Sequence, residues 1–227
     1  MKRRTKVLLG IVAGVVVVGA AGVIGGPIVY ANLVNNAADA APSLAPTGGA
    51  TLSATEADGT WTSTPTGFAG YRVHEVLRGQ DVTVTGRTKD VEARATVADG
   101  SLTAATVTVQ VASISTPESA RDDYFRGTAM QTDRFPTATF RVTAPVDVRA
   151  ALAGTDPDVA LRGELTLHGV TNAVTADAQL GVDRDGHVQV AGSVPITFAD
   201  YGVQAPDLGF VRVDDHGAVE FSVELAR

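Results

Sequence analysis

Four histidines and no cysteine set the limits of any chemistry in this chain. His168 stands between a strand-like run and a glycine, within 163–174, where an imidazole can serve as a general base or a metal ligand. No two histidines have the i, i+4 spacing of a zinc-binding helix, and no His-x-His pair occurs. The sequence also lacks a Gly-x-Ser-x-Gly elbow and a phosphate-binding loop. This inventory argues against a hydrolase or a metal enzyme.

The other three histidines have structural interpretations. His187 follows Asp185-Gly186 and His216 precedes Gly217, so both are interpreted as turn residues. His74 adjoins Glu75 in an expected strand. The run from Asp183 to Gly186 resembles the start of a calcium loop but lacks the later ligands and the terminal glutamate, so it is interpreted as a hairpin turn. We therefore predict no catalytic residue and no bound metal.

Charge and hydropathy divide the chain into unlike parts. The net charge is −7, although Lys2, Arg3, Arg4 and Lys6 cluster at the N-terminus, so the remainder is more acidic still. Clustered basic residues are what nucleic acids require, and they are absent from that remainder. An acidic body is also repelled by anionic headgroups, so electrostatics would not hold it on a membrane. We expect no nucleic-acid partner.

Residues 7–29 are uncharged and rich in Val, Gly, Ile and Leu. A helix of that length spans roughly 34 Å, enough for a bilayer core of about 30 Å. The basic stub at 1–6 predicts a cytoplasmic N-terminus, with the rest of the chain outside the cytoplasm. A cleaved signal peptide, with Ala38-Asp39-Ala40 as the cleavage site, is the alternative and would give a secreted protein. Gly10 and Gly14 fit a helix-pairing face, which leaves a homodimer open.

The remainder divides into a spacer and a globular domain. Residues 30–57 are mostly Ala, Asn, Pro, Gly, Ser and Thr without clear periodicity, which predicts a flexible linker. From residue 58 to 227 apolar and polar residues alternate in many short runs, each typical of a strand with one buried face. These runs are 71–77, 91–97, 105–111, 140–142, 159–167, 174–180, 188–198 and 219–225.

Turn and helix signals separate these strands. Asp99-Gly100 and Asp185-Gly186 are strong hairpin dipeptides, and His216-Gly217 is a weaker one. Thr116, followed by a proline and a glutamate, predicts one short helix that runs to about Gly127. At least eight antiparallel strands joined by tight turns close into a barrel or stack as a sandwich. Parity places His168 on the polar side of its strand, with Leu165 and Leu167 on the inner side.

Several segments together resemble the YceI-like, lipid- or polyisoprenoid-binding family over about 60–227. They are Trp61, Ser115-Thr116-Pro117 leading to Arg121-Asp122, Phe135-Pro-Thr-Ala-Thr-Phe140, Gly163-Glu-Leu-Thr-Leu-His-Gly-Val-Thr171 and Asp200-Tyr-Gly202. The resemblance implies an all-β fold, an antiparallel eight-stranded lipocalin-like barrel, whose interior holds an isoprenoid chain, often that of a quinone. It also implies export and brings no catalytic residues.

The leading hypothesis is a membrane-tethered, non-enzymatic barrel that binds a long apolar lipid tail, with no cofactor other than that lipid. Burial of the tail would drive binding, and cavity length and shape would discriminate between lipids. A cell-surface structural or interaction module with a filled barrel is the alternative. The residues predicted to line the ligand site are Tyr71, Val73, Phe125, Met130, Phe140, Val142, Leu161, Leu165, Leu167, Val194, Ile196 and Phe198.

Overall fold

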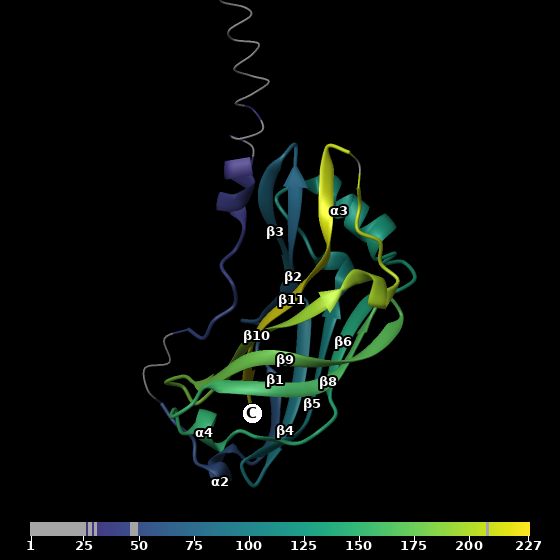
Figure 1. Cartoon of the computed structure of the whole chain (residues 1–227). Coiled ribbons are helices and arrows are strands. Elements are labelled where there is room, and N and C mark those ends of the chain that lie inside the picture. The colour runs from purple at the N-terminus through teal and green to yellow at the C-terminus, as the bar shows by residue number, and fades with distance from the viewer. Residues whose placement is uncertain (1–25, 27–28, 30, 46–49, 208) are drawn as a thin grey trace, which may run out of the picture.

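The alternating segments form strands that close into a ring, in a computed structural model that describes residues 26, 29, 31–45, 50–207 and 209–227. Eight antiparallel strands pair in the order β1-β4-β5-β6-β8-β9-β10-β11, and β11 pairs back onto β1 (Figure 1). The predicted barrel is confirmed, and the sandwich is excluded. The strands are β1 Gly59–Ser63, β4 Val91–Ala98, β5 Ser101–Gln110, β6 Thr137–Val142, β8 Asp158–Leu167, β9 Val170–Val182, β10 Val188–Thr197 and β11 Val211–Ala226.

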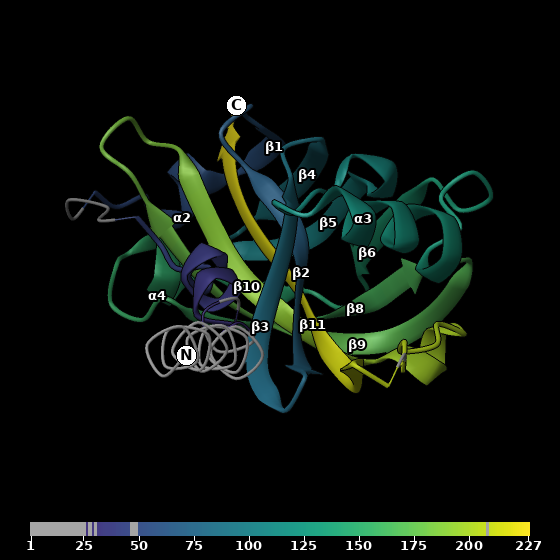
Figure 2. The same ribbon diagram turned by 90° about the horizontal axis from the view of Figure 1, so that it is seen from above.

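A hairpin of two further strands extends this ring at one end. Strand β2, Phe68–Leu77, pairs with β11 beyond the point where β11 pairs with β1, and β3, Gln80–Thr88, pairs with β2. The short strand β7, Val146–Asp147, pairs with β5. Figure 2, seen from above, places the β2–β3 hairpin beside α3, Ser119–Tyr124. The β2–β3 hairpin thus extends the ring on one side, and α3 lies beside this hairpin.

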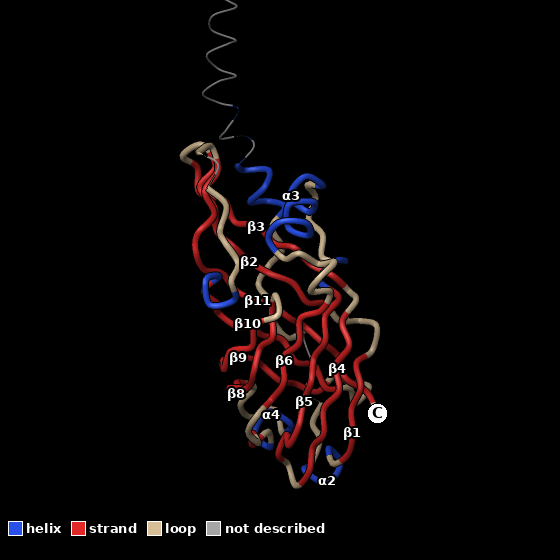
Figure 3. Tube along the Cα trace, turned by 90° about the vertical axis from the view of Figure 1, so that its right-hand side faces the viewer, coloured by secondary structure: helices blue, strands red, loops and turns tan. Residues whose placement is uncertain are grey.

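Short helices lie at both ends of the barrel, where a single one was expected. Helices α2, Ala54–Ala57, and α4, Arg149–Leu152, lie at the end opposite α3 (Figure 3). The predicted helix begins at Ser119, three residues after Thr116, and α3 continues as the π-turn η2, Phe125–Ala129. Two 3-10 turns, η1, Val111–Ser113, and η3, Phe198–Tyr201, also belong to the barrel domain.

Two-residue hairpin loops explain the shape of several turns. Arg78-Gly79, Asp99-Gly100 and His168-Gly169 each join neighbouring strands with positive φ at both positions. Such a loop matches the twist of the flanking strands, and glycine adopts the second conformation without strain. The predicted turn at Asp99-Gly100 is therefore confirmed. Asp185-Gly186 also lies in a hairpin, between β9 and β10, but the loop runs over residues 183–187.

The predicted turn at His216-Gly217 is wrong. Both residues lie within β11, where the register with β2 shifts between Val213 and Gly217. A Cβ at position 217 would lie 2.8 Å from the carbonyl oxygen of Arg72, so glycine permits a close approach of two strands there. The dipeptide marks a bulge that bends one long strand, not a reversal of the chain.

The described part of the expected linker packs on the barrel. Residues 31–37 are helical, and Val34 packs against the cluster that holds Val84 of β3. The Asn35 side chain donates to the carbonyl of Asp81 at 3.1 Å and accepts from the amide of Thr83 at 2.7 Å. Because β3 is an edge strand, Asn35 satisfies backbone groups that would otherwise face solvent. Residues 31–37 of the expected linker thus contact the edge of the sheet.

A buried ionic network holds the next residues of that segment. Glu220 of β11 is 3% exposed, and its carboxylate accepts from Arg72 Nε at 2.6 Å. Arg87 lies 3.5 Å from Glu220 and 3.3 Å from Asp39. Arg72 also donates to the carbonyl of Asp39 at 2.7 Å. The two guanidinium groups thus join Glu220, on the outer face of β11, to Asp39. Asp39 lies 33 residues before Arg72 in the sequence.

The predicted anchor at 7–29 lies outside the described residues except for Gly26 and Val29, and the basic stub at 1–6 lies outside them entirely. Within the described part of the chain, no helix combines the length and the apolar character that crossing a bilayer requires.

Gly163 offers a test of how tightly the barrel wall is packed. A Cβ at this position of β8 would lie 2.4 Å from the carbonyl oxygen of Arg141 and 2.6 Å from Cζ of Phe140. We expect Gly163→Ala to lower the free energy of unfolding by about 1–3 kcal/mol, because the added methyl group displaces backbone. Urea denaturation measures this. Gly127→Ala is the control, since its Cβ meets no atom within 4 Å; equal effects of both changes would contradict the packing argument.

Candidate functional site

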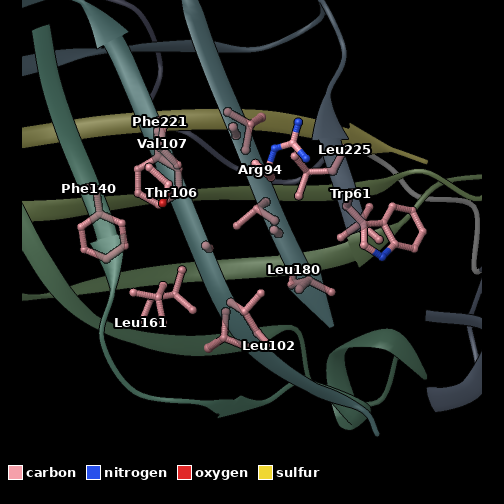
Figure 4. Close-up of a pocket in the computed structure, with 18 of the residues that line it drawn as sticks. Trp61, Arg94, Leu102, Thr106, Val107, Phe140, Leu161, Leu180, Phe221 and Leu225 are labelled. Atoms are coloured by element: carbon pink, nitrogen blue, oxygen red, sulfur yellow. The ribbon is translucent and has the colours of Figure 1, made fainter. Parts of the chain in front are cut away.

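Side chains from all eight strands of the ring surround an apolar cavity inside the barrel (Figure 4). The space that the centre of a water molecule can occupy inside this cavity is about 110 Å³. Arg94 and Thr106 also border the cavity, but both are exposed residues of the outer face. Among the described residues that line it, no other is charged. One lining residue from each strand in turn is Trp61, Ala95, Val107, Phe140, Leu161, Leu180, Val190 and Phe221.

Small residues on two neighbouring strands leave this space open. Ala93 and Ala95 of β4 point inward, and Ala105 of β5 lies directly opposite Ala95 in the register. Larger side chains, such as Leu161 of β8, come from other strands of the ring. An eight-stranded barrel is just wide enough to be filled by side chains, so alanines on one wall leave a void. An apolar void of this kind offers water no hydrogen-bond partners.

Different groups close the two ends of the cavity. At one end lie Ala57 of α2 and Leu152 of α4, both buried, and the indole Nε1 of Trp61 donates to the carbonyl of Ala57 at 2.9 Å. At the other end, Met130 belongs to a second apolar cluster with Val111 and Ile114, against which Phe125, Tyr71 and Leu167 pack. The α3 end is therefore closed by side chains of the long connection between β5 and β6.

The structure places five of the predicted lining residues around the cavity. These are Phe140, Val142, Leu161, Leu165 and Val194. Leu167 and Ile196 pack against the main core without bordering the cavity. Phe198 lies in η3, also outside the lining.

Tyr71, Val73, Phe125 and Met130 lie at the α3 end, in the apolar clusters beyond the cavity. Tyr71 and Phe125 stack with ring centroids 5.0 Å apart, and Arg121 of α3 donates to the buried carboxylate of Glu75 at 3.1 Å. These contacts fasten α3 to the inner face of the β2–β3 hairpin. Nine of the twelve predicted residues thus form two groups, five around the cavity and four at its α3 end.

Several lining residues were not among the predicted site residues. They include the β4 and β5 residues named above and the inward positions of β11, Val219, Phe221, Val223 and Leu225. Their alternation with polar residues was visible in the sequence. Alternation identifies the inner face of each strand, but which inner residues border a void depends on the side chains opposite, which no single strand reveals.

Burial changes the ionisation of Tyr71. The phenol lies at the α3 end, and its ring lies so close to Gly86 that a Cβ there would be 2.5 Å from Tyr71 Cε1. Loss of hydration raises the pKa of Tyr71 to about 12, with the nearby guanidinium of Arg121 acting in the opposite direction. The neutral phenol is therefore strongly preferred in the folded protein.

His168 lies at a turn outside the cavity. Its φ is +50°, its Nδ1 lies 3.0 Å from the carbonyl oxygen of Tyr201, and its ring packs edge-on to Phe135 with centroids 4.6 Å apart. These contacts fix the β8–β9 hairpin against η3. No hydroxyl nucleophile is hydrogen-bonded to this imidazole among the described residues.

A closed antiparallel barrel with an apolar interior defines the class of small lipocalin-like β-barrel proteins. The YceI-like domain model matches residues 62–225, and the chain belongs to that family. No curated protein matches the chain.

Two solved structures share the fold. BcnA of Burkholderia cenocepacia is 23% identical, with a TM-score of 0.52 over 69% of this chain and 96% of its own. A polyisoprenoid binding domain from Saccharophagus degradans, implicated in plant cell wall breakdown, is 17% identical, with a TM-score of 0.56 over 73% of this chain and 97% of its own. At these identities the likeness concerns the fold.

The buried phenol predicts a loss of stability at high pH. A tyrosine in the unfolded chain ionises near pH 10, and Tyr71 in the folded protein near pH 12. The contribution of Tyr71 to the free energy of unfolding is therefore complete below about pH 10. Between about pH 10 and 12 this contribution, roughly 2–3 kcal/mol, is lost. We expect Tyr71→Phe to remove this loss of stability with rising pH. In an alkaline titration followed at 295 nm, it should also remove the last phase of tyrosinate absorbance. Tyr124→Phe, which also removes one tyrosine, should leave both in place; loss of the phase in that variant instead would refute the assignment.

Proposed function

We propose that this barrel binds the apolar tail of a long-chain lipid, a polyisoprenoid or an isoprenoid quinone, without chemical change to it. The observation that carries the proposal is the cavity walled by apolar side chains of every strand of the ring. Each Å² of tail removed from water contributes about 25 cal/mol, so an apolar wall is sufficient for affinity. The relative from Saccharophagus degradans, whose name describes polyisoprenoid binding, supports the same ligand class.

A long tail needs more room than the present cavity of about 110 Å³, since pockets for ordinary ligands occupy about 300–1,000 Å³. The extra space would come from the α3 end, where Tyr71, Phe125 and Met130 fill the closure. Displacement of α3 would join that end to the cavity. The two groups of predicted residues would then line one continuous site.

The small cavity favours a second candidate function. A barrel whose interior is nearly filled by its own side chains would serve as a structural or protein-interaction module at the cell surface, with no lipid. Both candidates share the fold and differ in whether the interior opens.

We also propose that residues 7–29 tether the barrel to the outer side of the cytoplasmic membrane. The helical residues 31–37 lie beside β3, at the end of the barrel where α3 also lies (Figure 1). A tether at this end would bring the closure of the cavity close to the lipid surface, from which an apolar tail could enter.

The lipid-binding proposal predicts that filling the cavity removes the ligand. Purified full-length protein in a mild detergent should yield an isoprenoid lipid on organic extraction and mass spectrometry, and added isoprenoids should raise its Tm. Ala105→Phe adds a phenyl ring to an inward position of β5 and should abolish both effects. Trp61, the single tryptophan, borders the cavity, so ligand binding should also change its fluorescence.

Ala104→Phe is the matched control, since Ala104 is an exposed neighbour on the same strand. It should bind lipid as the wild-type protein does. Empty extracts together with an unchanged Tm across several chain lengths would favour the filled-barrel module.

The tether predicts the behaviour of the intact chain in cell fractions. Full-length protein should stay with the membrane after alkaline carbonate washing, and protease added outside the cytoplasmic membrane should degrade the barrel. A chain that lacks residues 7–29 should remain in the cytoplasm. Release of a shortened, soluble protein from intact cells would show cleavage and secretion instead.

A further inference from the structure

Three groups suited to metal binding converge at the end of the barrel away from α3. Asp183 and His187 flank the loop between β9 and β10, and Glu224 lies near the end of β11. One ligand atom from each lies within 4.8 Å of the other two. His187 Nδ1 is 3.5 Å from Asp183 Oδ2 and 3.4 Å from Glu224 Oε1.

Neighbouring groups orient both carboxylates. Asp183 Oδ1 accepts from the amides of Asp185 and His187, each at 2.9 Å, which leaves Oδ2 on the side of the imidazole. Glu224 Oε1 accepts from the Thr64 hydroxyl at 3.0 Å. The two carboxylate side chains are only 17% and 18% exposed. Ligands held in this way need little reorganisation when a cation arrives.

The spacing fits a small tetrahedral cation better than direct hydrogen bonds. Distances of 3.4 and 3.5 Å exceed the range of about 2.7–3.2 Å for a hydrogen bond to oxygen. Zinc binds imidazole nitrogen and carboxylate oxygen at about 2.0–2.2 Å, and tetrahedral geometry then places neighbouring ligand atoms roughly 3.4 Å apart. The imidazole also disfavours calcium and magnesium, which prefer oxygen ligands.

We propose that Asp183, His187 and Glu224 bind a divalent transition-metal cation of the zinc type, with water in the remaining position. The sequence around Asp183 was interpreted as a hairpin turn because it lacks the later ligands of a calcium loop. Glu224, which the fold brings from β11, adds the third ligand of a different site.

The site lies beside the seam that closes the barrel. Strand β11 pairs with β1 through Thr62 with Ala226 and Ser63 with Leu225, and the amide of Thr64 donates to the carbonyl of Glu224 at 2.8 Å. A cation held by Glu224 and the β9–β10 loop would fasten this end of β11 to its neighbour. Metal binding should therefore stabilise the ring, whether or not the barrel carries a lipid.

The test uses the full-length protein in detergent, stripped with a chelator and free of any affinity tag. Titration calorimetry with Zn²⁺ should show one site per chain, Zn²⁺ should raise the Tm, and Co²⁺ should give the intense visible absorption of a tetrahedral complex. His187→Ala should weaken Zn²⁺ binding by about tenfold or more and abolish the cobalt spectrum. Glu224→Gln, which keeps the hydrogen bond to Thr64 available, should do the same with less effect on the fold.

The control is His216→Ala, because His216 also pairs with a carboxylate, that of Asp215 at 2.8 Å, but in an exposed position outside the cluster. It should leave Zn²⁺ binding unchanged. The proposal fails if the wild-type protein binds no zinc, or if well-folded His187→Ala binds it as tightly as the wild type.

Discussion

The closure of the ring between β1 and β11 is the constraint on which the other features depend. Closure removes the free strand edges of the ring and creates an inside, so that the apolar face of every strand is buried against the others. Yet β1 is short, and β11 continues past it to pair with β2. The same long strand therefore closes the barrel at one end and carries the β2–β3 hairpin at the other. The bulge before Gly217 lies within the part of β11 that pairs with β2, and it bends the strand at that end.

This division gives the two ends of the barrel different properties. At the end with α2 and α4, Trp61 and the cluster of Asp183, His187 and Glu224 lie close to the seam, where additional contacts hold the ring together. At the other end, α3 is fastened to the hairpin by one ion pair and an aromatic stack. Exchange of an apolar ligand requires one end of the barrel to open while the other stays closed. The contacts at the seam end and at the α3 end differ in this way.

The outer face of the barrel is less solvated than alternation alone predicts. Glu220 occupies a polar position of β11, but Arg72, Arg87 and the segment around Asp39 cover it. A buried carboxylate is tolerated there because two guanidinium groups and their hydrogen bonds compensate for its lost hydration. The segment around Asp39 therefore follows a defined path along the barrel wall.

The sequence by itself determined eight of the strands with their inward faces, the turn at Asp99-Gly100 and the position of the helix after Thr116, because these follow from local periodicity and turn chemistry. It missed β1, β3 and the short β7. It also carried the motifs that resemble the YceI-like family. Tertiary structure decided which inward residues border a void. That depends on which residues become neighbours on adjacent strands, as Ala95 of β4 and Ala105 of β5 do. It also turned His216-Gly217 into a bulge and brought Glu224 to His187. Contacts between residues far apart in the chain depend on strand register and closure, which no local pattern specifies.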